Sequence, residues 1–517
     1  VGPSQPCWRT GAPVKRLITD GTVQVPPLQA TGAASPRAAK ASSVGVWAGP
    51  KASARRVSIT MSTTSRAGAS AGGLGGDEAQ AKSQSGAVHI RPVYTAGRVH
   101  RNLTRAGRIE ARRGGYVVPD PPWRSPMDKM LALTFDRSRE DWASSTGLVK
   151  EVIPAPTLDE AQDPGDAERV LIKVKYAGFC GSDRGIWWRK AFGDMILGSL
   201  DDEGRDKRVV GHELLGEIIA VGSKVAEGFG LKVGDVVSTE SHIVCGVCYQ
   251  CQVGDLHVCA KDKIIGISMD GCFAERLKLP AKSLWPTDLE KIRPEVAAVQ
   301  EPFGNAVHAC QATDLNGKTV AILGCGTIGL FAILVARGMG AKTIIGVEVN
   351  PHHADLARRL GCDVVLTPNP ASPLKPYASD PLLRAKIREL TDGVGVDVAM
   401  EMAGFNDSFN NALRVVRRGG HVVAFGVKNG DAVIEDIHRL VMDGIHIHGI
   451  VGRQIFGTWE ITKRLLEDRT NGIQDRIWEV ILNSGQGTMV DIRDWERSSF
   501  EKVISEHPKA LIRFAGS

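Results

Sequence analysis

The segment Lys318–Glu348 reads KTVAILGCGTIGLFAILVARGMGAKTIIGVE, and it decides the fold of the chain. Thr319–Leu323 is a short apolar run typical of a buried strand, and glycines follow it at once in G-x-G-x-x-G spacing. Leu330–Met339 is apolar enough for a buried helix, and Thr343–Val347 predicts a second strand that ends at Glu348. Strand, glycine turn, helix, strand and acid in this order predict a dinucleotide-binding βαβ unit rather than an ordinary loop.

Each glycine of this unit has a distinct role in that interpretation. Gly324 permits the tight turn, Gly326 lets the backbone approach a pyrophosphate, and Gly329 lets the helix pack closely on the strand. The free N–H groups of the helix N-terminus attract phosphates. Glu348 is placed to accept hydrogen bonds from a ribose, and its charge would repel a 2′-phosphate, which favours NAD over NADP. The predicted cofactor-binding residues here are Gly324, Gly326, Thr327, Ile328, Gly329 and Glu348.

Further strands recur between helical patterns after Glu348 and complete a sheet. The candidates are Val364–Leu366, Val396–Met400, His421–Phe425 and His446–Ile450. With the first two strands they predict a doubly wound, six-stranded parallel sheet in an α/β fold. Ligands of such sheets lie beyond the carboxyl ends of the strands, so Gly426 is a candidate for lining the nicotinamide, with a plain turn glycine as the alternative. Arg453 could hold cofactor phosphates or a substrate carboxylate, with a surface arginine as the alternative.

The composition is that of a globular protein, with 43% apolar and 24% charged residues among 517. Residues 1–126 carry a net charge of +13, whereas the rest of the chain carries −7. We therefore expect no nucleic-acid partner, because the positive charge belongs to one segment. No apolar run is long enough to predict a membrane span.

Residues 1–126 differ from the rest in composition. They are rich in Ala, Ser, Gly and Arg, poor in acidic and aromatic residues, and without helical or strand periodicity. This composition predicts a disordered N-terminal extension. It also fits an organellar transit segment, so the sequence leaves open a cytoplasmic or an organellar location (mitochondrion or plastid).

Four of the ten cysteines lie close together, which is a metal-binding pattern rather than a secreted disulfide framework. Four thiolates at C-x2-C-x2-C-x7-C spacing can close a tetrahedron around one zinc ion and leave no position open, so we predict a structural site. The alternative is a set of free core cysteines, which the polar, glycine-containing loop argues against. The predicted ligands are Cys245, Cys248, Cys251 and Cys259.

A second set of potential metal ligands is discontinuous. Cys180 offers a thiolate, His212 an imidazole and Glu213 a carboxylate. A catalytic zinc uses about three protein ligands and an open position, which these residue types could provide. Taken singly, each has an ordinary structural alternative, a buried cysteine or a polar surface pair.

Taken together, these motifs resemble the zinc-dependent medium-chain dehydrogenase/reductase family over residues 130–517. The motifs are, in chain order, Gly178–Asp183 (GFCGSD), Gly211–Glu213 (GHE), the four-cysteine loop and the dinucleotide turn. Within the family, three further segments are most similar to the threonine dehydrogenases. They are Ser241–Gly246, Glu301–His308 (EPFGNAVH) and Gly449–Arg453 with Trp459.

The resemblance implies a β-rich GroES-like catalytic domain beside the Rossmann sheet, two zinc ions and NAD. It implies that Cys180, His212 and Glu213 bind the catalytic zinc, with Glu301 as a fourth ligand or a supporting carboxylate. Ser182 stands where the family has the hydroxyl that begins proton removal. The implied reaction is hydride transfer from a small secondary alcohol to NAD, with zinc as Lewis acid. The implied divisions are 1–126, 127–300 (catalytic), 301–452 (NAD-binding) and 453–517 (return), in a homo-oligomer.

Two departures from the family pattern leave the substrate open. The threonine dehydrogenases have a histidine three residues beyond the hydroxyl, and Gly185 occupies that position here. The segment between Cys180 and His212 is also longer than usual. Threonine is the expected substrate, a sugar or polyol is the alternative, and a non-catalytic NAD-binding protein is the alternative of another class.

Overall fold

The computed structural model describes residues 129–369, 375–426 and 430–514. The predictions for residues 1–126 lie outside this range. A six-stranded parallel sheet forms in the second half, in the order β13-β12-β11-β14-β15-β16, as the sequence predicted. Its strands are β11 (Thr319–Leu323), β12 (Thr343–Val347), β13 (Val364–Leu366), β14 (Val396–Glu401), β15 (Val416–Ala424) and β16 (His446–Gly449).

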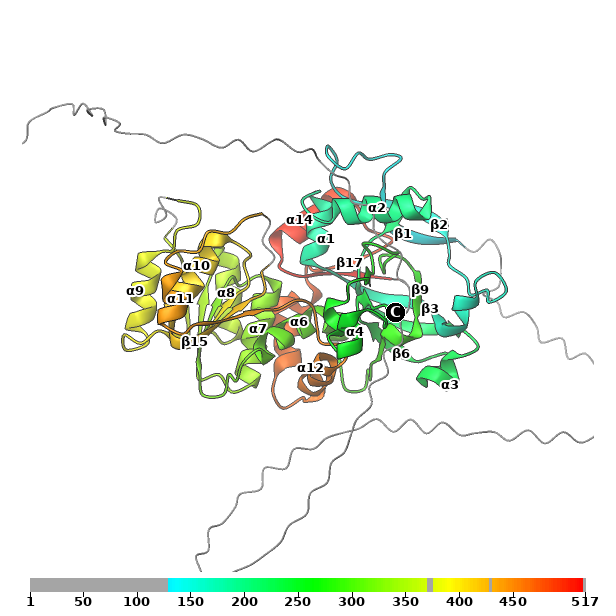
Figure 1. The fold of residues 1–517 in the computed structure, drawn as a ribbon. Helices are drawn as coiled ribbons and strands as arrows, with labels where there is room; N and C mark the ends of the chain where they lie inside the picture. The colour runs from blue at the N-terminus through cyan, green and yellow to red at the C-terminus, as the bar shows by residue number, and fades with distance from the viewer. Residues whose placement is uncertain (1–128, 370–374, 427–429, 515–517) are drawn as a thin grey trace, which may run out of the picture. The chain divides into compact units, whose positions relative to one another are not determined.

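Both faces of this sheet are covered by helices, which gives the doubly wound arrangement (Figure 1). Val320 and Ile322 of β11 pack into the core that contains α6 and α7, whereas Ala321 and Leu323 pack into the core that contains α9 and α10. Strands buried on both faces are apolar at every position, which explains the continuous run in β11. The helices of this half are α6 (Gln300–Gln311), α7 (Thr327–Gly338), α8 (Pro351–Leu360), α9 (Pro381–Glu389), α10 (Asn406–Val415) and α11 (His438–Met442).

A seven-stranded, mainly antiparallel sheet forms the β-rich part of the chain. Its central strand is β3 (Arg169–Phe179), which pairs with β5 and β9, both before the parallel sheet in sequence. It also pairs with β18, which lies near the C-terminus, after the parallel sheet. The other strands are β5 (Glu213–Val221), β6 (Val236–Thr239), β9 (Arg276–Pro280), β10 (Leu284–Pro286), β17 (Met489–Asp491) and β18 (Ala510–Arg513).

Smaller elements surround this sheet. The first strand, β1 (Lys129–Asp136), pairs with both β2 and β4. The remaining strands are β2 (Val149–Pro154), β4 (Lys207–Val209), β7 (His242–Ile243) and β8 (Lys263–Ile264). The remaining α-helices are α1 (Gly181–Trp187), α2 (Gly193–Glu203), α3 (Val225–Phe229), α4 (Tyr249–Val253), α5 (Pro294–Ala297), α12 (Gly457–Glu467), α13 (Ile473–Arg476) and α14 (Arg497–Glu506).

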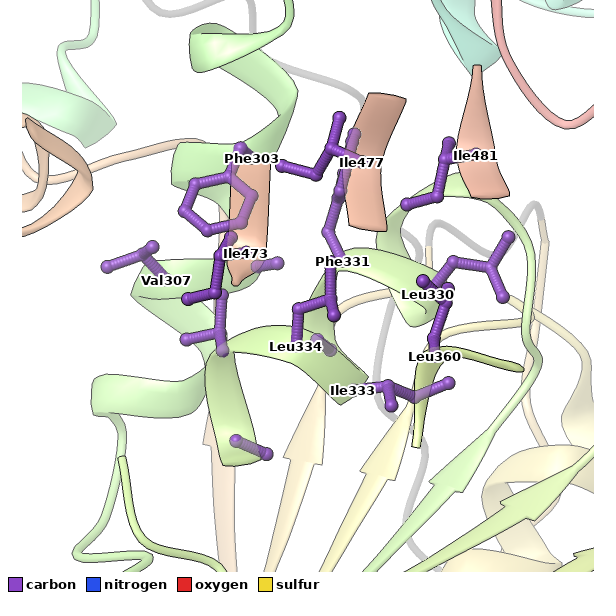
Figure 2. Close-up of a cluster of buried hydrophobic side chains, with 14 of the residues drawn as sticks. Phe303, Val307, Leu330, Phe331, Ile333, Leu334, Leu360, Ile473, Ile477 and Ile481 are labelled. Atoms are coloured by element: carbon purple, nitrogen blue, oxygen red, sulfur yellow. The ribbon is translucent and has the colours of Figure 1, made fainter. Parts of the chain in front are cut away.

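The largest apolar core lies between α6, α7 and the segment that follows α13 (Figure 2). Phe303 of α6 and Phe331 of α7 are fully buried, and their rings meet edge to face with centroids 5.6 Å apart. Ile473, Ile477 and Ile481 close the same core. This packing ties the helix of the dinucleotide turn to α6, which carries Glu301.

We expect Phe331→Ala to lower the free energy of unfolding by about 3–5 kcal/mol, because truncation leaves a cavity between α6 and α7. Phe405→Ala is the matched control, since that ring is 66% exposed, and it should change stability by less than about 0.5 kcal/mol. Urea unfolding followed by fluorescence measures both. Equal losses in the two variants would contradict this picture of the core.

Candidate active site

The sheet brings the three discontinuous metal-ligand candidates together. Cys180 caps α1 directly after β3, and His212 and Glu213 lead into β5, the antiparallel neighbour of β3. One ligand atom from each of the three lies within 4.8 Å of the others. Gly178, opposite Glu213 in the register, is required here because a Cβ would stand 1.9 Å from a Glu213 carboxylate oxygen.

Asp183 orients two members of this cluster. Its Oδ2 accepts the backbone N–H of Cys180 at 2.8 Å, and its Oδ1 lies 3.6 Å from Nδ1 of His212. Nε2 of His212 is 3.2 Å from the Ser182 hydroxyl. Burial alone would lower the pKa of His212, but the negative charge of Asp183 and Cys180 raises it to about 10. This holds the imidazole protonated at neutral pH, so a metal ion that binds through Nε2 must displace a proton.

Glu213 is neutralised from the C-terminal part of the chain. Lys509, fully buried just before β18, donates to Oε2 of Glu213 and to the carbonyl of Phe179. Burial raises the pKa of Glu213, and the charge of Lys509 opposes that shift. No local sequence signal marks Lys509 as a site residue, because its role comes from the sheet pairing alone.

Glu301, the predicted fourth ligand, does not belong to the group of three that lies within 4.8 Å. It lies at the start of α6, where its Oε1 accepts the Ser241 hydroxyl and the Arg453 guanidinium, each at 2.8 Å. Arg453 also binds both oxygens of the Glu240 carboxylate and the amide oxygen of Asn305. The structure therefore places Glu301 as a carboxylate held beside the cluster.

This geometry argues against the predicted role of Arg453 as a cofactor-binding residue. Arg453 is only 2% exposed, and its five N–H donors are directed at Glu240, Ser241, Asn305 and Glu301. No donor is left for a phosphate. The sequence pattern could not show this, because the carboxylate partners precede Arg453 by more than 150 residues.

The unsatisfied polar atoms of the site fit a metal ion. Oε1 of Glu213 and Oε2 of Glu301 are buried without a hydrogen-bond partner within the described residues. An orphaned buried carboxylate oxygen is costly and calls for a missing cation. Thiolate, imidazole and carboxylate are also the donors that zinc uses in catalytic sites.

The four cysteines of the loop also converge on one point. A sulfur atom from each lies within 4.8 Å of the other three. Backbone N–H groups of Cys251 and Ala260 lower the pKa of the Cys248 thiol to about 6, which favours the thiolate that binds metal. Backbone N–H groups also point at the sulfurs of Cys245 and Cys259. The donor set fits a closed tetrahedral zinc site.

The dinucleotide turn has the expected backbone geometry. Gly324 has φ +95°, and a Cβ on Gly329 would stand 2.0 Å from the Gly324 carbonyl oxygen. A Cβ on Gly326 would meet nothing within 4 Å, so open space lies over the turn. Glu348 accepts N–H groups from Cys325, Val349 and Asn350. These features fit a bound dinucleotide, with room for its phosphates above Gly326.

Thr327 and Gly426, two other predicted cofactor residues, contact other parts of the protein. Thr327 donates its hydroxyl to the carbonyl of Pro508, and Ile328 follows half-buried in the first turn of α7. Gly426 lies against the next strand end, because a Cβ there would meet Gly404 and the Glu401 carboxylate. That close approach is a structural reason for glycine at this position, independent of a ligand.

The position where a histidine was expected, Gly185, is closed by the inserted segment. A Cβ at residue 185 would stand 2.9 Å from the Cβ of Ala191, between α1 and α2. Any side chain here requires the connection to move. The contact with Ala191 is a local structural reason for glycine at position 185.

Comparison with known proteins agrees with this geometry. Residues 166–289 match the family model described as alcohol dehydrogenase GroES-like domain, and residues 327–468 match zinc-binding dehydrogenase. The L-threonine 3-dehydrogenase of Bacillus licheniformis is 35% identical over 327 residues, which are 63% of this chain and 86% of that protein.

Solved structures share the fold. Alcohol dehydrogenase TADH from Thermus sp. ATN1 superposes with a TM-score of 0.60 at 23% identity, over 74% of this chain and 100% of that one. An alcohol dehydrogenase from Escherichia coli CFT073, complexed with the cofactor NADH, gives 0.57 at 21% identity, over 75% and 99%.

The chain belongs to the zinc-dependent alcohol dehydrogenase family of medium-chain dehydrogenases/reductases, and it is an oxidoreductase. The predicted family and enzyme class are thus confirmed. None of the helices in the described part of the chain combines the length and the apolar character needed to cross a membrane.

We expect Cys248→Ser to lower the zinc content from two ions per chain to one, because three thiolates no longer close the loop site. Cys310→Ala is the control, since Cys310 is buried in the core away from both clusters and should leave two ions. Elemental analysis of the purified proteins measures this. A Cys248→Ser protein that keeps two ions would contradict the structural site.

We expect Arg453→Met to lower the free energy of unfolding by about 3–5 kcal/mol, because Glu240 and Glu301 are left buried without a cation. Adding Glu240→Gln should restore part of that loss, since one buried charge is then removed. Arg359→Met, on the exposed face of α8, is the control and should change little. Thermal and urea denaturation compare the four proteins, and a harmless Arg453→Met would contradict the ion cluster.

Proposed function

We propose that the protein oxidises a small secondary alcohol with NAD, and that L-threonine, oxidised at C3 to 2-amino-3-oxobutanoate, is the substrate. The observation that carries this proposal is the 35% identity to an L-threonine 3-dehydrogenase over 86% of the length of that enzyme. The donor set around Cys180 supports the same chemistry, because it suits a zinc ion with an open position.

In this proposal the chain holds two zinc ions. Cys180, His212 and Glu213, with Glu301 beside them, hold the catalytic ion, and the four-cysteine loop holds the structural one. The catalytic ion, when bound, supplies Lewis acidity toward the alcohol oxygen, and NAD accepts the hydride. Ser182 lies next to His212, where its Oγ can accept a hydrogen bond from the substrate hydroxyl while its own O–H passes a proton on to water.

NAD is proposed to bind at the dinucleotide turn, with its phosphates at the N-terminus of α7 and a ribose at Glu348. The open space over Gly326 and the carboxylate of Glu348 support this placement. The NADH complex of the Escherichia coli relative supports it by fold alone. The proposed divisions remain 127–300 for the catalytic domain, 301–452 for the NAD domain and 453–517 for the return.

A homo-oligomer is also proposed. Strand β16 is the edge of the six-stranded sheet, and apolar side chains are exposed on it and beside it. Ile447 is 40% exposed, Val441 77% and Met442 76%. Apolar side chains gathered at a sheet edge favour contact with another chain.

A sugar or polyol is the second candidate substrate. The threonine dehydrogenases have a histidine at the position of Gly185, where it takes the proton from the hydroxyl residue. Here Gly185 is closed by Ala191, so the chain departs from that pattern. A neutral polyol needs hydrogen-bonding partners, whereas threonine also needs partners for an ammonium and a carboxylate. The substrate assay separates the two.

We expect L-threonine to drive NAD reduction, and D-glucose, sorbitol and 2-butanol to be turned over at least about tenfold more slowly, measured as kcat/KM. A zinc chelator should abolish turnover, as should Cys180→Ala, whereas Cys310→Ala should keep it. Turnover of sorbitol or glucose in place of threonine would replace the substrate assignment. Absence of turnover for all four, with zinc and NAD bound, would overturn the proposed reaction.

A further inference from the structure

Arg184 of α1 is a half-buried cation that the proposed chemistry does not yet use. It follows the segment Cys180–Asp183 that carries the metal-site residues. Its Nη2 donates to the carbonyl oxygens of His507 at 2.6 Å and Pro508 at 3.1 Å. Its Nε and Nη1 have no hydrogen-bond partner within the described residues, and neither atom is sealed inside the protein.

Arg184 also differs from other buried arginines of the chain in its electrostatic partners. Arg189 pairs with Glu140, Arg208 with Glu203 and Asp270. Across the described residues, no carboxylate lies within 4.0 Å of the Arg184 guanidinium; burial lowers its pKa, and the more distant charges of Cys180, Asp183 and Glu213 oppose that shift without cancelling it. A guanidinium withdrawn from water needs an anion, since carbonyl groups offer only partial charge.

The neighbours of Arg184 place it at the dinucleotide turn. The Pro508 carbonyl oxygen that accepts from its Nη2 also accepts from the Thr327 hydroxyl. Thr327 is the first residue of α7, whose N-cap is Gly326. Two donors that share one acceptor atom lie side by side, so the guanidinium stands beside the N-terminus of α7.

Two other cations of the site are already paired with buried carboxylates. Lys509 is fully buried against Glu213 and the Phe179 carbonyl, and Arg453 is saturated by its own cluster. His353 and His507 lie in the field of Arg184, but burial and that field lower the pKa of both imidazoles. Among these side chains Arg184 alone combines a permanent charge and unused donors with a position that is not fully buried.

We propose that Arg184 binds the diphosphate of the dinucleotide together with the adjacent N-terminus of α7. This inference rests on the proposed function, because it adds a residue to the proposed NAD site. The helix N–H groups and the guanidinium fork supply complementary donors to the phosphate oxygens. Cys180 is the N-cap of α1 and Ser182 lies in its first turn. This one short helix would therefore link the cofactor to the metal cluster.

The test is direct binding to the full-length, zinc-loaded protein rather than activity. Arg184→Met removes the charge and keeps an unbranched side chain, and Arg184→Lys keeps the charge without the fork. Lys190→Met is the charge-matched control, because Lys190 is exposed three residues beyond the end of α1. The ligands are NADH and ADP-ribose, which contain a diphosphate, and adenosine, which does not. Titration calorimetry measures all three.

We expect Arg184→Met to weaken the binding of NADH and ADP-ribose by about 10- to 100-fold, because charge-assisted hydrogen bonds to the diphosphate are lost. The affinity for adenosine should not change. Arg184→Lys should recover part of the loss, and Lys190→Met should bind all three ligands like the parent. Zinc content and melting temperature show that each variant is folded.

Three outcomes would overturn the proposal. Parental binding of NADH and ADP-ribose by Arg184→Met would remove Arg184 from the site. Equal weakening of adenosine would show that the substitution distorts the turn instead of removing a diphosphate contact. A parent protein that does not bind NADH at all would overturn the proposed function itself, which separates the two failures.

Discussion

The catalytic end of this fold depends on balancing buried charge. Asp183, Glu213 and Glu301 are each at most 3% exposed and lie around one thiol and one imidazole. Each buried carboxylate costs several kcal/mol unless a cation or hydrogen bonds compensate it. His212 faces Asp183, Lys509 pairs with Glu213, and Arg453 is shared between Glu301 and the buried Glu240. The site exists only because all three partners are in place.

The buried carboxylates and their cationic partners lie far apart along the chain, which affects how the site assembles. The carboxylates come from the β-rich part and from α6, whereas Arg453 follows the last strand of the parallel sheet and Lys509 precedes β18. The metal site is therefore complete only after the C-terminal segment has returned to pair with β3. The same return supplies the Pro508 carbonyl between Arg184 and Thr327, so it contacts the dinucleotide turn as well.

Features set by neighbouring residues could be predicted from the sequence, whereas side-chain contacts between distant segments could not. Strands β11, β12 and β13 have the predicted bounds, because apolar runs between glycine turns carry their own signal. The four cysteines converge as expected, since a short loop holds their spacing. Arg453 was assigned to the cofactor because no local pattern shows that Glu240 and Glu301 surround it. Its role depends on long-range packing, as does that of Lys509.

The hydrogen bond between Ser182 and His212 connects the metal site to the proton path. The carboxylate of Asp183 lies 3.6 Å from Nδ1, and the Ser182 hydroxyl lies 3.2 Å from Nε2. A ring nitrogen has one lone pair in the ring plane. If His212 gives that lone pair to a metal, the Ser182 hydroxyl loses its partner and is free for a substrate oxygen. Gly185, closed by Ala191, offers no side chain that could continue from this hydroxyl along α1.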